Sequence, residues 1–175
     1  MSPSGDIGQS QRPLRETLLI MSNMNKLAGK IVAAMMDEDA FSQWLGIRVI
    51  SIVPGACQLQ MQVTPAMCNG FSLAHGGIAF SLCDSGCSFA VNAHGRKAMS
   101  VETGISHLKA IQPGDVLNCF VSEESLGKKL GVYTAEVINH EETKIAIFRG
   151  TYYRSDKKWF EEADIFTEPP LTKTI

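Results

Sequence analysis

The chain has 175 residues, of which 45% are hydrophobic, and a formal net charge of −2 at pH 7. This length suits one domain with a substantial core, and the scattered basic residues argue against nucleic acid as a partner. The most apolar stretch, residues 70–93, is interrupted by His75, Asp84, Asn92 and four glycines, so no membrane partner is expected. Residues near the amino end lack the order of a signal peptide, which favours a cytoplasmic location.

The amino-terminal part predicts a flexible extension followed by an amphipathic helical cover. Residues 1–25 mix Ser, Gly, Pro, Gln and Arg, a composition typical of weak order, and both Met21 and Met24 are possible translation starts. Apolar side chains recur at helical spacing across residues 26–39, and residues 39–45 predict a second short helical turn. That turn carries three large apolar side chains, Phe41, Trp44 and Leu45.

Two strands and a long helix are predicted next. Residues 47–53 and 56–63 have strand patterns, and apolar side chains in the second alternate strictly with glutamines. A loop containing Asn69-Gly70 leads to an apolar helix at residues 76–93, which ends at His94-Gly95. Four further strands are predicted, at residues 98–108, 116–126, 131–139 and 144–154.

This order of elements indicates an α+β fold. Helices do not alternate with strands as a parallel sheet would require, and the short turns between the last four strands favour an antiparallel sheet with the long helix on one face. We therefore expect one domain at residues 26–154 and a tail at residues 155–175, where charged residues and Pro169-Pro170 replace any periodic pattern.

The five cysteines are expected to be small buried apolar side chains without disulfides, in a reducing compartment. Cys83 and Cys87 stand one helical turn apart and could flank a metal with His75 or His94. No second Cys/His pair has ligand spacing, however, and no metal site is expected. Cys83 is also a poor nucleophile, because an apolar helix disfavours the thiolate.

The glycine pair Gly76-Gly77 at the start of the long helix is a candidate oxyanion site. Glycine has no side chain to keep a ligand away, so the backbone N–H groups at a helix amino end can approach a developing negative charge. Asp84 lies eight residues later inside an apolar run, where a carboxylate needs a partner or a function. Together these residues indicate acyl transfer to water, although a surface or ion-paired Asp84 remains the alternative.

Helix geometry separates the two groups. Eight residues of α-helix span about 12 Å, so Asp84 cannot readily serve the amino end of its own helix. If both groups are catalytic, Asp84 must come from another subunit, and two antiparallel helices related by a twofold axis would place each Asp84 near the other Gly76. Serine hydrolases, nucleotide hydrolases and dinucleotide-dependent oxidoreductases lose support, because their glycine-containing motifs are absent.

The sequence resembles the hot-dog-fold acyl-CoA thioesterases over about residues 41–154, and within them the thioesterases of phenylacetic acid degradation. The resemblance rests on one spaced motif, Asn69-Gly70-x4-His75-Gly76-Gly77-x6-Asp84, and on Gly114-Asp115, Gly127-Lys128, Gly131-Val132-Tyr133 and Phe148-Arg149-Gly150. It implies an antiparallel sheet wrapped around a long central helix, and a homo-oligomer, dimeric or a dimer of dimers, with the active site shared between subunits. It also implies hydrolysis of phenylacetyl-CoA or its ring-hydroxylated forms without a cofactor.

The resemblance further implies a role for each motif residue. Gly76 N–H would polarise the thioester carbonyl, Asp84 of the partner subunit would act as base or nucleophile, and Asn69 would help position water or the carboxylate. The expected substrate-binding residues are His75, Gly77, Phe71, Lys109 and Lys128; Lys109 is followed by Ala110 where relatives often have Arg-Pro. Two alternatives remain at this stage, a thioesterase for medium or long acyl chains and an acyl-CoA binding module without activity.

Overall fold

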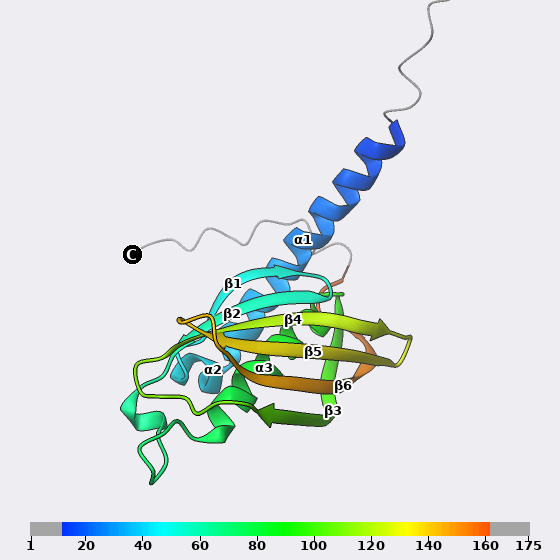
Figure 1. The fold of residues 1–175 in the computed structure, drawn as a ribbon. Coiled ribbons are helices and arrows are strands. Elements are labelled where there is room, and N and C mark those ends of the chain that lie inside the picture. Colours follow the sequence, from blue (N-terminus) through cyan, green and yellow to red (C-terminus); the bar gives the residue numbers. More distant parts are fainter. Residues whose placement is uncertain (1–11, 162–175) are drawn as a thin grey trace, which may run out of the picture.

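The computed structural model describes residues 12–161, which form one six-stranded antiparallel sheet with a long helix against one face (Figure 1). The strand order is β1-β2-β4-β5-β6-β3. The elements are α1 (Arg12–Glu38), α2 (Ala40–Trp44), β1 (Arg48–Val53), β2 (Ala56–Gln62), a 3-10 turn (Pro65–Met67), α3 (Gly76–Asn92), β3 (Arg96–His107), β4 (Val116–Leu126), β5 (Leu130–Asn139) and β6 (Lys144–Lys158). The predicted α+β fold, an antiparallel sheet wrapped around a long central helix, is confirmed.

Helix α3 lies directly on the sheet because its contact face is small where the two approach. A Cβ atom on Gly86 would lie 2.9 Å from Val121 Cγ2 and 3.3 Å from Leu59 Cδ1, closer than ordinary packing permits. Leu59 belongs to the predicted alternation of β2, whose apolar residues all face this helix side of the sheet and are buried. The backbone of α3 is therefore fixed against β2 and β4, and the position of its amino end follows.

Four cysteines fill the layer between α3 and the sheet, as predicted. Cys57, Cys83, Cys87 and Cys119 are buried, and all five cysteines are free. Burial raises the pKa of the Cys57 thiol to about 12 and also raises the pKa of Cys87. A raised pKa keeps a thiol protonated and unreactive, so these two cysteines contribute packing and not chemistry.

The predicted start of the first helix is wrong. Helix α1 begins at Arg12, so residues 12–25, which we expected to be part of a flexible extension, are helical. Pro13 stands in the first turn, where its missing N–H costs nothing, and the following Leu, Glu and Met residues favour helix. The amino-terminal half projects away from the sheet (Figure 1) and its apolar side chains are exposed, which is why no packing pattern marked it in the sequence. Residues 1–11 of the expected extension lie outside the described part.

The carboxyl-terminal boundary also differs. Strand β6 continues to Lys158, four residues past its expected end, because Arg96 of β3 pairs with Lys158 and so extends the ladder into the expected tail. The remainder of that tail, residues 162–175, is not described. Within residues 12–161 no helix is both long and apolar enough to cross a membrane.

Strand β3 forms an open edge of the sheet. It pairs with β6 on one side, and its exposed residues include Met99 and Val101, which are 65% and 58% exposed. An edge strand with unpaired backbone groups and exposed apolar side chains among its polar ones is a ready surface for another strand. This edge lies beside α3 and ends at His107, next to the amino end of that helix.

Candidate active site

The two glycines at the amino end of α3 differ in what their N–H groups do. His75 is the N-cap, and its Nδ1 accepts a hydrogen bond of 3.0 Å from Gly77 N–H. His75 therefore caps the helix, and the Gly77 donor is already used. Among the described residues Gly76 N–H has no hydrogen-bond partner. The helix therefore presents one free donor, at the positive end of its dipole.

Asp84 lies on the third turn of the same helix, about 12 Å from Gly76 along the axis. Tyr152 of β6 donates a hydrogen bond of 2.9 Å to Asp84 Oδ1, which holds the carboxyl group in one orientation. Burial raises the pKa of Asp84, and the hydrogen bond from Tyr152 opposes that effect. A carboxyl group that is partly desolvated and fixed in place has the properties of a base or nucleophile. Within one chain it does not reach Gly76.

Asn69 forms the turn that leads to the helix. Its Oδ1 accepts hydrogen bonds from Phe71 N–H at 2.9 Å and Leu73 N–H at 3.4 Å, and its backbone N–H bonds to Leu73 O. Ser72 takes a positive φ of 60°, as a tight turn of this kind requires. The Nδ2 group of Asn69 has no partner in the described structure, so only the amide N–H₂ remains for water or substrate.

An apolar hollow of about 370 Å³ opens beside the helix end. His75, Gly77, Ile78 and Ser81 contribute from the helix side, and the opposite wall includes Phe41, Trp44, Ala66, Met67 and Cys68. The rings of Phe41 and Trp44 are stacked with centroids 5.9 Å apart. Both residues were expected only in the amphipathic cover, and their shared face gave no sign of a pocket. Phe71, the aromatic residue expected to contact substrate, is 85% exposed and does not line this hollow.

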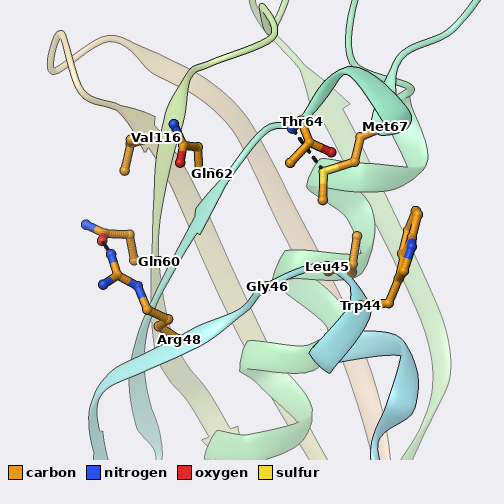
Figure 2. A pocket seen from close by; sticks show the side chains of 9 residues that line it. All are labelled: Trp44, Leu45, Gly46, Arg48, Gln60, Gln62, Thr64, Met67 and Val116. Carbon is orange, nitrogen blue, oxygen red and sulfur yellow. Dashed lines mark hydrogen bonds between the residues drawn. The ribbon is translucent and has the colours of Figure 1, made fainter.

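A second hollow of about 440 Å³ adjoins the first through Trp44 and Met67 (Figure 2). Its far wall is polar, with Gln62 and the paired side chains of Arg48 and Gln60. Neither Gly76 nor Asp84 lines it. The larger of these two hollows therefore lies away from the candidate catalytic groups, and its lining is the more polar of the two.

The two lysines expected to bind substrate lie at opposite ends of the molecule. Lys109 is exposed and follows β3, close to the segment where Ala74 N–H bonds to Ile111 O beside the start of α3. Lys128 is in the β4–β5 turn, where its carbonyl accepts from Arg96 at the other end of β3. Of the predicted residues, the structure brings Asn69, His75, Gly76, Gly77 and Lys109 to one end of α3, and it places Lys128 elsewhere.

One neighbour of Gly76 was missed by the sequence analysis. The ring of His107, the last residue of β3, lies against Gly76: its Nε2 is 3.1 Å from the position of a Cβ atom built there. His107 is 31 residues away in the chain and belongs to none of the motifs. Only the pairing of β3 with β6 beside α3 brings it to the site.

Fold and site together define a hot-dog thioesterase. The family model of the thioesterase superfamily matches residues 71–146, a range that includes Gly76, Asp84 and His107. The chain is 35% identical over 131 residues to the acyl-coenzyme A thioesterase PaaI of Escherichia coli strain K12, covering 75% of this chain and 94% of that protein. The chain therefore belongs to the thioesterase superfamily, and it is a thioester hydrolase.

Its similarity to PaaI extends to three dimensions. The structure of the E. coli PaaI protein from the phenylacetic acid degradation operon matches with a TM-score of 0.75 at 33% identity, covering 77% of this chain and 98% of that one. A variant of the phenylacetic acid degradation protein PaaI from Thermus thermophilus matches with a TM-score of 0.64 at 26% identity, covering 67% and 100%. A putative esterase of Archaeoglobus fulgidus is 32% identical over 130 residues, covering 74% and 84%.

Proposed function

We propose that this protein hydrolyses arylacetyl-CoA thioesters, phenylacetyl-CoA or its ring-hydroxylated forms, to the free acid and CoA. The observation that carries the proposal is the unpartnered Gly76 N–H at the end of α3, beside an apolar hollow. The relative named acyl-coenzyme A thioesterase PaaI, 35% identical, supports CoA as the thiol and phenylacetic acid degradation as the setting.

The reaction in this proposal takes place between two subunits. Gly76 N–H and the helix dipole stabilise the charge that develops on the carbonyl oxygen. Asp84 of the partner subunit takes a proton from water, water oxygen bonds to the carbonyl carbon, and the C–S bond breaks to release the CoA thiolate, which then takes up a proton. Direct attack by the carboxylate, followed by hydrolysis of the anhydride, uses the same geometry. Donor, base and water suffice, so we propose no cofactor.

A homodimer supplies the missing carboxylate. The open edge of β3, which exposes Met99 and Val101, lies next to α3, so pairing of two β3 strands would bring two α3 helices together about a twofold axis. Antiparallel helices would then set Asp84 of one subunit near Gly76 of the other.

The aryl group is proposed to occupy the hollow at the helix end. Phe41 and Trp44 offer stacked aromatic surface there, and an offset or edge contact with a second aromatic group adds about 0.5–1.5 kcal/mol beyond the area buried. Asn69 Nδ2, free in the described structure, would orient water or the carbonyl. Phe71 is exposed and does not line this hollow, so we assign it a contact with substrate bound by the partner subunit.

Free-thiol release from a panel of CoA esters tests the proposal. Phenylacetyl-CoA and hydroxyphenylacetyl-CoA should give a higher kcat/KM than straight-chain esters of similar size. Asp84→Asn keeps the shape and removes the base, so kcat should fall at least about a hundredfold with CoA-ester binding largely retained. Asp156→Asn, a change at a 73% exposed carboxylate, is the matched control and should leave kcat unchanged.

Two results would replace the proposal with the alternatives. A preference for long straight chains would make the protein a general acyl-CoA thioesterase. Tight binding of CoA esters with no thiol release from the parent protein would make it a binding module. Near-parent turnover by Asp84→Asn would show that this carboxyl group is structural.

A further inference from the structure

The imidazole of His107 lies over the amino end of α3, on the side of the open β3 edge. Three of its ring atoms, Nε2, Cε1 and Cδ2, are 3.1, 3.6 and 3.8 Å from the ideal Cβ position of Gly76, and Nε2 is the nearest. The side chain is exposed, and its nitrogens have no hydrogen-bond partner in the described structure. The Nε2 atom of His107 thus lies beside Gly76, the residue whose N–H is the one free backbone donor at this end of the helix.

We propose that His107 is a second donor to the thioester carbonyl, so that His107 Nε2–H and Gly76 N–H together form the oxyanion hole. This inference rests on the thioesterase function proposed above and adds a catalytic residue to it. As water adds to the carbonyl carbon, both donors hold the oxygen that gains negative charge. When the C–S bond breaks and the carbonyl re-forms, both donors keep their protons.

The distances permit one oxygen to accept from both groups. An ideal Cβ lies about 2.5 Å from the nitrogen of its own residue, so Gly76 N and His107 Nε2 are at most about 5.6 Å apart. Two N–H donors that each lie about 2.9 Å from one oxygen can be at most about 5.8 Å apart. The separation of the two nitrogens therefore permits one carbonyl oxygen to accept from both.

The other histidine at this end cannot take the role. His75 Nδ1 already accepts from Gly77 N–H, which fixes that ring as the helix cap. His107 has no such engagement, and a neutral imidazole with its proton on Nε2 offers one donor to a ligand. Glycine at position 76 favours this arrangement, because a Cβ atom there would lie 3.1 Å from His107 Nε2 and the ring would have to shift by a few tenths of an ångström.

The test separates hydrogen bonding from ring packing. His107→Phe keeps a flat ring against Gly76 and removes the donor, so kcat for phenylacetyl-CoA should fall about a hundredfold to a thousandfold, the range for loss of one oxyanion donor. KM should change by less than about threefold, since the bond strengthens only in the transition state. His107→Gln restores an N–H donor and should give a kcat at least about tenfold above that of His107→Phe.

Control variants and measurements distinguish loss of the hydrogen-bond donor from loss of the fold or of ligand binding. His140→Phe makes the same chemical change in a turn on another part of the surface and should leave kcat at the parent value. Circular dichroism and melting temperature establish that each variant is folded, and binding of a CoA thioether, which lacks the carbonyl oxygen, should be equal in all of them. If folded His107→Phe turns over within threefold of the parent, or if His107→Gln recovers nothing, the second donor is wrong. A parent protein inactive on every CoA ester would instead overturn the proposed function.

Discussion

The two ends of helix α3 carry similar polar residues and differ in whether those residues are satisfied. The carboxyl end holds Asn92, His94, Glu123 and Tyr133, and each of these side chains is hydrogen bonded inside the protein. At the amino end, Gly76 N–H lacks any partner within the described structure. A cluster of His, Glu and Tyr is therefore not by itself a functional site, and an unsatisfied donor is the better sign of one.

Asn92 closes the carboxyl end. It is buried, and its Nδ2 donates to Ser88 O at 2.8 Å and Ala98 O at 3.0 Å. Its Oδ1 accepts from Ala98 N–H at 2.9 Å and from Trp159 Nε1–H at 2.7 Å. One side chain therefore joins the helix, the start of β3 and the segment after β6, and its full hydrogen-bonding capacity is used.

The neighbouring cluster of His94, Glu123 and Tyr133 is likewise hydrogen bonded within itself. Glu123 Oε2 lies 2.6 Å from both His94 Nε2 and the hydroxyl of Tyr133, which donates to it. Burial, together with the nearby Glu123 carboxylate, raises the pKa of Tyr133. These residues hold one another in place, and their mutual hydrogen bonds occupy the groups that a ligand would need.

Subunit mixing tests the amino end of α3, and it has the largest expected effect. Asp84→Ala and Gly76→Val should each lower activity at least about a hundredfold, because one lacks the base and the other blocks the donor. A mixed dimer has one intact site, built from Gly76 of the first chain and Asp84 of the second. Random re-pairing makes half the dimers mixed, so activity should return to about a quarter of the parent value. With exchange verified by mass spectrometry, absence of any recovery would exclude a site shared between subunits.

Disrupting the hydrogen bonds at the carboxyl end of α3 should lower stability and leave kcat unchanged. Asn92→Ala removes four hydrogen bonds and leaves their part-buried partner groups unpaired, which should cost about 2–4 kcal/mol of unfolding free energy. For a chain of this size the melting temperature should fall by about 5 °C or more. The kcat per folded molecule, measured well below the transition, should equal that of the parent; a large loss of kcat would show that the closed end takes part in catalysis.

Asn69→Asp separates the two roles of Asn69 at the amino end of α3. Aspartate keeps the oxygen that accepts from Phe71 and Leu73 N–H, so the turn should survive with little change in melting temperature. It lacks the free amide N–H₂, and kcat should fall about tenfold if that group orients water or the carbonyl. Unchanged kinetics would restrict Asn69 to its role in the turn. Asn69→Ala, which loses both functions, should lower activity and melting temperature together.

The smallest effect concerns Asp84 itself. Burial raises its pKa in the folded protein, so this carboxyl stabilises the fold below its unfolded pKa of about 3.9, and that contribution is lost as pH rises through the raised value. Asp84→Asn can still accept from Tyr152, and it should melt about 2 °C higher than the parent at pH 7. The difference should shrink towards pH 4. A variant that melts lower at pH 7 would mean that the charge is stabilised by a group outside the described chain.

The sequence predicted those features of the fold and site that depend on local pattern. Strict alternation in β2 and the apolar run from Gly76 to Asn92 gave the buried faces, and glycine and proline marked the turns. The arrangement of Gly76 and Asp84 from two different subunits could be inferred from the sequence, because a helix has a known rise per residue. The start of α1 was missed, since the apolar side chains in its amino-terminal half are exposed and form no buried face.

The helix with its glycine amino end and its internal carboxylate could be predicted from the sequence alone, because both lie on one continuous element. Which donors are free depends on contacts between elements: His75 accepts from Gly77 N–H and leaves Gly76, while Asn92 and Glu123 bind partners from distant segments. The same holds for His107, which strand pairing brings to Gly76 across 31 residues. Hydrogen-bond satisfaction depends on contacts between elements, and no spacing along one element can reveal it.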